Sequence, residues 1–297
     1  MGVPNVAETA AYYVEFGLIP EQDGWFSTQD GGRQLRITDA PTRRLLEMHI
    51  GADDQDDLAR VASQLRRLGE EPRVAPGVVT AVEPTTGITV QVEITPRLVQ
   101  RPSSPVAYNQ PGRTPRVGAR GASARRQGRV QPRKLGHAVV GTADHVQTVR
   151  FFTEGIGFKV SDRIKEVGAF LRCSFDHHNL LVLQAPVTFL HHTSWQVNDV
   201  DEVGKGAFDM LEGHPERHVW GLGRHYAGSN FFWYLKDPAG NFSEYYSDLD
   251  CIVDDQLWTP EDMEGAKGLF DWGPPPPPSF LRPDDLAAMM TGAHSPR

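Results

Sequence analysis

The sequence predicts an α+β protein built from two similar domains, and three observations lead to that fold class. An internal repeat relates residues 6–18 to residues 146–158, with a constant offset of 140 residues. Stretches that resemble a short strand followed by an amphipathic helix recur along the chain. Short β-rich segments follow those helices. A chain of 297 residues also has the length expected of about two domains.

Each copy of the repeat contains a predicted helix, at residues 6–13 and 146–152. Each helix runs toward a glycine, Gly17 or Gly157, because a helix end often needs a residue that tolerates a positive φ. Residues 135–140 precede the second copy and have the pattern of a short strand. The second copy therefore begins with a strand and continues as a helix.

The same strand-then-helix pattern occurs in two more places. Residues 45–50 lead into a helical stretch at 57–68, and residues 193–197 lead into one at 200–211. Residues 89–94 alternate apolar and polar side chains, as a half-buried strand does. Four such units in two pairs would give two similar α+β domains.

We expect the N-terminal domain at residues 1–100 and the C-terminal domain at residues 135–255. Between them, residues 101–134 contain nine Arg or Lys, five Pro and no Asp or Glu. This segment is either a solvated linker or an arm that packs along the acidic body or a neighbouring subunit. The tail, residues 256–297, contains the run 274–278 of five prolines, which favours extended polyproline II. We expect this run to form a tail, arm or lid rather than core.

Composition excludes several classes of protein. The formal net charge of -8 argues against nucleic-acid binding, which selects basic surfaces. No apolar run approaches the ~18 residues of a membrane span. The N-terminus carries Glu8 and Glu15 and lacks the basic region of a secretory signal. The two cysteines do not make a disulfide framework, which favours a reducing, cytoplasmic setting.

The histidines are distributed unevenly between the two halves. Ten of the eleven lie at or after His137, and His49 alone lies in the first half. In the repeat, the counterpart of His137 would fall before the sequence starts, and that of His192 falls near Leu45. The two halves are therefore expected to share a fold but not a chemistry.

Three residues in the second half form a candidate metal site. His137 and His192 each open a predicted strand. Glu244 follows an Asp-Pro-x-Gly turn that leads into a last strand, where alternation puts it on the face of Phe242 and Tyr246. A buried carboxylate needs a cation or a proton.

Two imidazoles and one carboxylate form the facial triad of non-haem iron(II) enzymes, with further positions left open. These positions suit a reaction in which a catecholate and dioxygen bind together. Zinc with a water could use the same ligands, so ligand type alone leaves the metal open. The segment Gly-Leu-Gly-Arg at residues 221–224 lacks the third glycine and the strand-to-helix context of a dinucleotide site, so no dinucleotide cofactor is expected there.

With these residues the sequence resembles the two-domain type I extradiol dioxygenases of the vicinal oxygen chelate superfamily. The resemblance covers nearly the whole chain, and its motifs lie within residues 135–247. The segments that carry it are 136–137, 176–180, 190–192, 223–226, Tyr234, 237–241 and 244–245.

The resemblance implies that each domain is a pair of βαβββ modules and that only the C-terminal domain binds metal. It implies ring opening of a catechol-type substrate by dioxygen at iron(II), with manganese(II) equally acceptable to these ligands. The sequence departs from the family in one respect, because the first strand of the N-terminal half is expected to be missing. A homo-oligomer is expected, since the linker and tail offer subunit contacts. Which catechol is cleaved stays open.

Proton transfer in such a reaction calls for a group that titrates near neutrality. His178 is the candidate, since a strand–turn–strand path could return it to the pocket of His192. His178 also matches the acid–base histidine of the family, with His177 as the second choice. His225 and Tyr234 match family residues that hydrogen-bond the substrate or a metal-bound oxygen.

The remaining candidates have structural interpretations. His191 neighbours a predicted ligand on a strand and is expected to point the opposite way. Phe170 and Trp195 are either pocket or core residues. Two other functions are weighed: a glyoxalase- or epimerase-type metal enzyme of the same fold, for which a fourth protein ligand is lacking, and a small-molecule binding module, which would leave three placed ligands unexplained.

Overall fold

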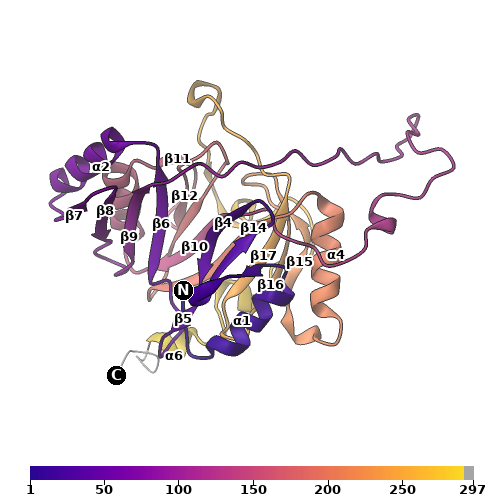
Figure 1. Ribbon diagram of the computed structural model, residues 1–297, viewed down its shortest axis with the longest axis horizontal. Helices are drawn as coiled ribbons and strands as arrows, with labels where there is room; N and C mark the ends of the chain where they lie inside the picture. Colours follow the sequence, from indigo (N-terminus) through magenta and orange to yellow (C-terminus); the bar gives the residue numbers. More distant parts are fainter. Residues whose placement is uncertain (291–297) are drawn as a thin grey trace.

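A computed structural model describes residues 1–290 and has the predicted α+β organisation (Figure 1). Within that range, strands of the second half form one nine-stranded sheet, and strands of the first half form three smaller sheets. None of the described helices combines the length and apolar character that crossing a bilayer requires.

We number the four strand–helix–strand units in chain order as modules 1 to 4. In modules 2, 3 and 4 the first strand pairs in parallel with the last, and the third and second strands follow in antiparallel order. This βαβββ arrangement confirms the predicted modules. Their elements are β6 Glu47–Ala52, α2 Gln55–Arg67, β7 Arg73–Ala75, β8 Val78–Val82, β9 Thr89–Ile94, β10 Lys134–Thr142, α3 His145–Arg150, β11 Lys159–Ile164, β12 Gly168–Arg172, β13 Leu180–Gln184, β14 Phe189–Gln196, α4 Val200–Leu211, β15 His218–Arg224, β16 Phe231–Lys236 and β17 Phe242–Ser247.

Module 1 departs from this pattern. Its first strand, which we expected to be missing, is present as the two residues of β1, which pair in parallel with β5. The other strands form a separate antiparallel sheet. Its elements are β1 Gly2–Val3, α1 Val6–Glu15, β2 Ile19–Pro20, β3 Trp25–Thr28, β4 Gly31–Arg36 and β5 Thr38–Asp39.

The internal repeat is reproduced at the helix ends. Helix α1 is followed by Gly17, and α3 continues as a π-helical turn, Phe151–Ile156, that is followed by Gly157. Both glycines have a φ of 101°, a conformation that side-chain-bearing residues rarely adopt. The predicted role of these two glycines is therefore confirmed.

Strands β10 and β14 join modules 3 and 4 into one sheet. Their pairing contains two β-bulges, at Gly136 in β10 and at His191 in β14. A bulge gives one strand an unpaired extra residue and redirects the neighbouring side chains. Each bulge lies directly beside a predicted metal ligand.

Two of the hydrophobic clusters combine residues of both halves. One cluster joins module 2 to module 3, and a second joins module 1 to module 4. In the second cluster the ring of Phe16 stacks on Tyr245 with centroids 3.9 Å apart, and the Tyr245 hydroxyl donates to the Phe16 carbonyl at 2.6 Å. The first half therefore packs directly behind the strands that carry the predicted site.

The linker, residues 101–134, is largely exposed and extends away from the body between two attached ends (Figure 1). Near its end Arg126 pairs with Asp199 at 2.5 Å, and Arg133 pairs with Asp30 at 2.6 Å. These ion pairs hold the C-terminal part of the linker on the body.

The C-terminal segment, residues 256–290, closes one side of the second half. Strand β18, Asp262–Met263, extends the large sheet beside β11, and the short helices α5, Pro278–Leu281, and α6, Leu286–Met290, follow the proline run. Phe280 is buried in a cluster with Trp220. The surrounding aromatic side chains enclose the ring of Phe280, which lies two residues beyond the proline run. Residues 291–297 of the predicted tail lie outside the described range.

Candidate metal centre

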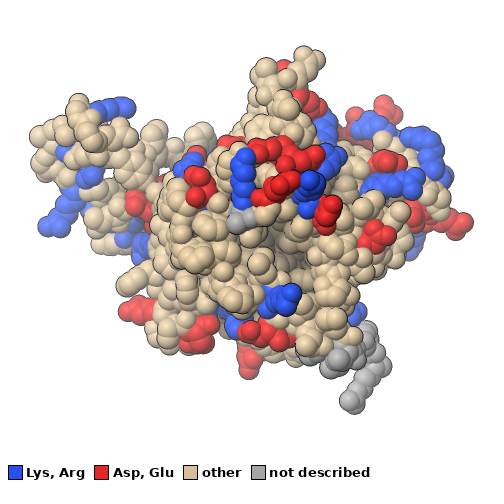
Figure 2. All heavy atoms as spheres, turned by 180° about the vertical axis from the view of Figure 1, so that it is seen from behind, with Lys and Arg blue, Asp and Glu red and all other residues tan. Residues whose placement is uncertain are grey.

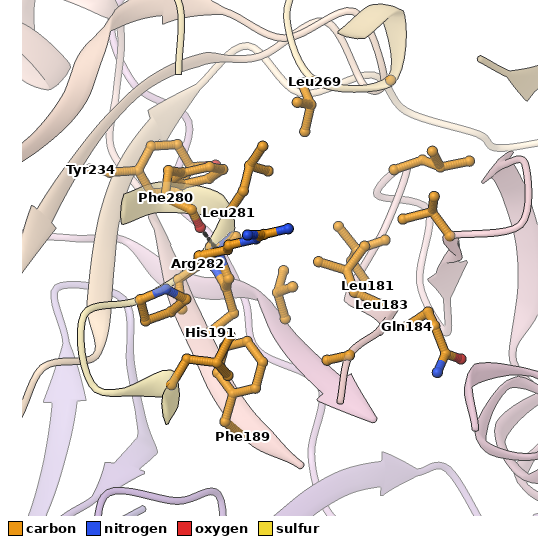
Figure 3. A pocket seen from close by; sticks show the side chains of 18 of the residues that line it. Leu181, Leu183, Gln184, Phe189, His191, Tyr234, Leu269, Phe280, Leu281 and Arg282 are labelled. Atoms are coloured by element: carbon orange, nitrogen blue, oxygen red, sulfur yellow. Dashed lines mark hydrogen bonds between the residues drawn. The ribbon is translucent and has the colours of Figure 1, made fainter. Parts of the chain in front are cut away.

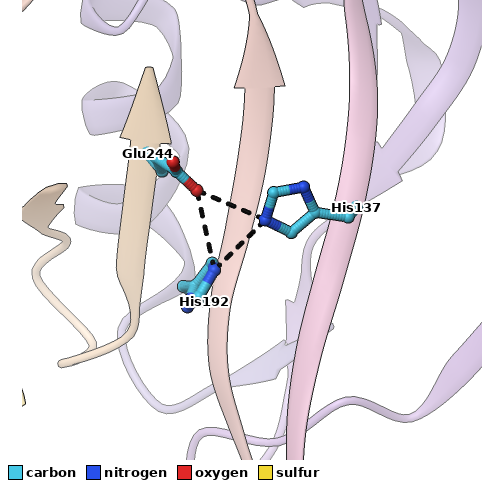
Figure 4. A group of neighbouring side chains, drawn as sticks. All are labelled: His137, His192 and Glu244. Atoms are coloured by element: carbon cyan, nitrogen blue, oxygen red, sulfur yellow. Dashed lines mark hydrogen bonds and ion pairs between the residues drawn. The ribbon is translucent and has the colours of Figure 1, made fainter. Parts of the chain in front are cut away.

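His137, His192 and Glu244 converge from three neighbouring strands, β10, β14 and β17 (Figure 4). The Nε2 atoms of His137 and His192 are 3.4 Å apart. Glu244 Oε2 lies 3.3 Å from His137 Nε2 and 3.6 Å from His192 Nε2. The three atoms form a nearly equilateral triangle that can offer a cation one face of ligands.

Strand alternation presents Glu244 to this face, as the sequence predicts. Phe242 and Tyr246 share its side of β17, and the Tyr246 ring lies 5.7 Å from the His137 ring. On the opposite side, Ser243 Oγ is 2.6 Å from the hydroxyl of Tyr12 in α1. Module 1 thus fixes the outer face of the strand that carries the carboxylate.

The carboxylate is fully buried and is partnered on one oxygen. Glu244 Oε1 accepts a hydrogen bond from Asn230 Nδ2 at 3.2 Å, whereas Oε2 has no hydrogen-bond partner among the described residues. Burial alone would raise the pKa of Glu244, but the imidazoles of His137 and His225 outweigh it and hold that pKa well below its usual range. An ionised oxygen without a partner, aimed at two imidazoles, is what a bound cation would satisfy. Asn230 carried no signal in the sequence.

A chain of hydrogen bonds determines which nitrogen of His192 is free. His191 Nε2 lies 2.6 Å from the carbonyl of Phe280, which can only accept, so this nitrogen carries the proton. Burial lowers the pKa of His191 to about 4, so its other nitrogen is a lone-pair acceptor. His192 Nδ1 lies 2.7 Å from this acceptor, His191 Nδ1, and donates to it. His192 Nε2, which faces Glu244, is therefore bare, that is, without a proton. Such an outer partner orients a ligating histidine.

The position of His191 corrects the sequence-based expectation. It was expected to point away from the site, but its ring lies 5.0 Å from that of His192 and lines the cavity. The reason is the β-bulge, because His191 is the extra residue of β14 and simple alternation does not apply there.

The residues present fit a divalent metal. Their donor atoms are two imidazole nitrogens and one carboxylate oxygen, all buried and within 4.8 Å of one another. Lone pairs and a negative charge that face each other repel unless a cation or proton lies between them. This donor set suits iron(II), manganese(II) or zinc.

His178 reaches the same pocket, and His177 does not. The His178 ring lies 4.2 Å from the His137 ring and lines the cavity. His177 lies behind it, fully buried. Burial, together with the neighbouring imidazoles of His137 and His177, lowers the pKa of His178 below its ordinary value, so the side chain is neutral and can accept a proton.

His225 and Tyr234 form a hydrogen-bonded pair on the other side of the cavity. His225 Nδ1 donates to the carbonyl of Leu269, so its Nε2 accepts from the Tyr234 hydroxyl at 2.9 Å. Burial first, and then the charge of Glu244, raise the pKa of Tyr234, which keeps the hydroxyl protonated. The pair can present a directed dipole to a bound oxygen atom.

The site opens into a mainly apolar cavity of about 880 Å³. Phe170 lines it, as one of the two expected alternatives, whereas Trp195 is buried in the core behind the sheet. The C-terminal segment supplies much of one wall, and Arg282 extends into the open space (Figure 3). These residues were not among the predicted site residues; the apolar side chains around the proline run were the available signal. The C-terminal residues involved are Leu269, Phe280, Leu281, Arg282, Pro283 and Leu286.

The face seen from behind is hollowed near its middle (Figure 2). Lys, Arg, Asp and Glu side chains gather above and below this hollow, while its edge is formed mainly by other residues.

Paired βαβββ modules around a buried face of two histidines and one carboxylate define a protein of the vicinal oxygen chelate fold with a candidate metal site. Comparison with known proteins identifies its family. The model of the Glyoxalase/Bleomycin resistance protein/Dioxygenase superfamily matches residues 134–245. Metapyrocatechase 2 of Cupriavidus necator is 36% identical over 293 residues, which cover 94% of this chain and 89% of that protein. The chain therefore belongs to the extradiol dioxygenases of this superfamily.

Solved structures agree with this fold. The crystal structure of the Mn(II)-bound glyoxalase from Novosphingobium aromaticivorans has a TM-score of 0.72 at 26% identity and covers 94% of this chain and 90% of its own. That of a halotolerant catechol dioxygenase has a TM-score of 0.72 at 20% identity, with 95% and 92% covered. The second likeness is one of fold alone.

Proposed function

We propose that this protein cleaves a catechol-type diol beside its two hydroxyls with dioxygen, in the catabolism of aromatic compounds. The observation that carries the proposal is the buried triangle of His137, His192 and Glu244 at the floor of an apolar cavity. A relative 36% identical over nearly the full length is named metapyrocatechase, which supports the same reaction here. The cytoplasm is the proposed compartment, and a homo-oligomer the proposed assembly.

Iron(II) is the proposed metal, with manganese(II) as the alternative. Relatives named as an iron-dependent and as a manganese-dependent dioxygenase both match this chain. When bound by the three ligands, such a metal supplies a Lewis acid that acidifies a bound hydroxyl and brings diol and dioxygen together.

The surrounding side chains are proposed to handle protons and orientation. The neutral imidazole of His178 takes a proton from one diol hydroxyl. Tyr234 and His225 orient an oxygen atom on the opposite side through their shared hydrogen bond. Aliphatic and aromatic walls, including Phe170 and Leu181, exclude water from the ring.

Oxygen consumption tests this proposal. Protein loaded with iron(II) under anaerobic conditions, and in parallel with manganese(II), is given a panel of monocyclic and bicyclic catechols before air is admitted. We expect uptake of one dioxygen per diol and a yellow ring-opened product. A Glu244→Gln variant should bind far less metal and consume no oxygen, while His214→Gln, at an exposed histidine remote from the cavity, should behave as the unmodified protein.

A glyoxalase-type reaction is the second candidate, favoured by the 26% identity to a Mn(II)-bound glyoxalase. Such an isomerisation needs no dioxygen, so metal-loaded protein that binds catechols without oxygen uptake would favour it. In the described residues the group of possible metal ligands at the cavity comprises three side chains, which leaves more open positions than an isomerase site with a fourth protein ligand.

A further inference from the structure

His177 and His178 form a second pair of consecutive histidines. His178 lines the cavity, and His177 lies behind it and connects it to Asp162, a carboxylate that the proposed reaction does not use. His177 is fully buried between His178 and Asp162 of strand β11. Its Nε2 lies 2.8 Å from Asp162 Oδ2, and its Nδ1 lies 3.0 Å from His178 Nδ1. The rings of Phe170 and Trp258 pack against it with centroids 5.8 and 5.2 Å away.

The donors and acceptors of this chain have a definite order. Asp162 Oδ1 accepts from the backbone N–H of Glu261 at 2.7 Å, and Oδ2 can only accept while the carboxylate is ionised. His177 Nε2 therefore carries a proton, and in the neutral form of the ring its Nδ1 is an acceptor. His178 Nδ1 must then donate. The remaining nitrogen, His178 Nε2, is bare on a ring that lines the cavity.

The same arrangement occurs once more in the site. In the pair His191–His192, the outer histidine is anchored by the Phe280 carbonyl and the inner one is left with a bare Nε2. Both pairs thus consist of an outer histidine held by an oxygen acceptor and an inner histidine whose lone pair faces the metal pocket. For His192 the lone pair suits a metal, and for His178 it suits a proton.

We infer that Asp162 and His177 form a positioning dyad that holds His178 with Nδ1 protonated and Nε2 bare, so that His178 can act as the base toward the substrate. This inference rests on the proposed function. In the step it serves, a diol O–H bond breaks, its proton forms an N–H bond at His178 Nε2, and the electron pair stays on oxygen. The resulting imidazolium keeps its Nδ1–H on His177, whose own N–H remains on the Asp162 carboxylate.

Asp162→Asn is the sharp test because it changes polarity with almost no change in volume. The Glu261 N–H still requires an oxygen acceptor, so the new amide nitrogen faces His177 Nε2 and donates to it. The protons of both imidazoles then move to the opposite ring nitrogens, which places the His178 proton on Nε2. We expect kcat to fall roughly 10²-fold, within the range for a lost acid–base group, with KM changed by less than about threefold and metal content unchanged.

Two variants of His177 separate polarity from packing. In His177→Gln the introduced amide can donate to Asp162 and accept from His178, so this variant should retain most of kcat. His177→Leu fills the space without that polarity and should lose kcat as Asp162→Asn does. Asp262→Asn, an equivalent change at the exposed Asp262 of β18, is the matched control and should leave kcat unaltered.

Nitrogen NMR of histidine provides a readout that does not depend on turnover. In full-length protein loaded with diamagnetic zinc and labelled with ¹⁵N-histidine, His178→Phe identifies the His178 signals. The inference requires a protonated Nδ1 and bare Nε2 in the unmodified protein and the reverse in Asp162→Asn. It is overturned by the opposite assignment, by unchanged kcat in Asp162→Asn, or by a kcat loss that follows loss of metal. If the unmodified enzyme cleaves no catechol, the proposed function fails, and the spectra still decide the dyad.

Discussion

At the scale of single residues, the imidazoles of the site differ in which nitrogen carries the proton. His191 and His225 each donate to a backbone carbonyl of the C-terminal segment, from Phe280 and Leu269. His192 depends on the first of these contacts for its bare Nε2. Residue type and spacing predicted the side chains that converge, but the partner that orients each one comes from a different part of the chain.

Replacing His191 tests whether this orientation matters for metal binding. His191→Phe removes the acceptor for His192 Nδ1–H and leaves the Phe280 carbonyl unpaired. Because outer partners of ligating histidines typically contribute 10–100-fold in metal affinity, we expect a loss of that order. His191→Gln can donate to the carbonyl and accept from His192, so it should lose less. Competition titrations with a metal chelator measure both; equal affinity in all three proteins would contradict the orienting role.

At the scale of elements, the strands and helices could be predicted from the periodicity of the sequence, but the irregularities within them could not. The strand at residues 89–94 and the helix at 200–211 have the predicted bounds. The bulges at Gly136 and His191 had no sequence signature, because a bulge depends on how two strands pair. A Cβ at Gly136 would lie 2.0 Å from the Tyr246 hydroxyl, a contact visible only after β10 and β17 are in place.

Two glycines in helix α4 give a matched test of how this helix packs. A Cβ at Gly206 would lie 2.9 Å from the Tyr245 ring, whereas one at Gly204 would meet no atom within 4 Å. Gly206→Ala should therefore destabilise the protein by about 1–3 kcal/mol through overpacking. Gly204→Ala should stabilise it by about 0.5–1 kcal/mol, because alanine loses less entropy in a helix.

Urea denaturation of the two variants measures both changes in the free energy of unfolding. Since Tyr245 neighbours Glu244 on β17, Gly206→Ala should also weaken metal binding, and Gly204→Ala should not. Opposite signs at positions two residues apart would establish the packing; equal effects of the two substitutions would contradict it.

The C-terminal segment was the least predictable element. A proline run favours extended structure, and extended structure alone gives no location. Its position depends on contacts with distant residues, such as the hydrogen bond of 2.7 Å from Trp220 Nε1 to the Pro274 carbonyl. The cavity wall it forms could therefore not be placed from local sequence.

At the scale of the whole molecule, stability and the site are coupled through buried histidines. The pKa values of His178, His191 and His192 all lie below the ordinary 6.5, with burial as the first cause in each case. Below pH 6.5 these histidines bind protons in the unfolded chain but stay neutral in the folded protein, so the free energy of unfolding must decrease as the pH falls. Asp237 acts in the opposite direction, since burial raises its pKa to about 6 and the folded state binds its proton first. Because three histidines act against one aspartate, the net result is a loss of stability as the pH falls.

Metal-free protein should therefore lose free energy of unfolding as the pH is lowered from about 6.5 toward 4, by as much as about 1.4 kcal/mol per pH unit for each histidine that stays neutral. His191→Gln removes one titrating group while keeping its hydrogen bonds, so its pH dependence should be shallower by up to one proton. His214→Gln, at an exposed histidine, should leave the slope unchanged. Urea denaturation at a series of pH values measures the slopes. A slope in His191→Gln equal to that of the unmodified protein would mean that His191 is protonated in the fold and cannot accept the hydrogen bond from His192.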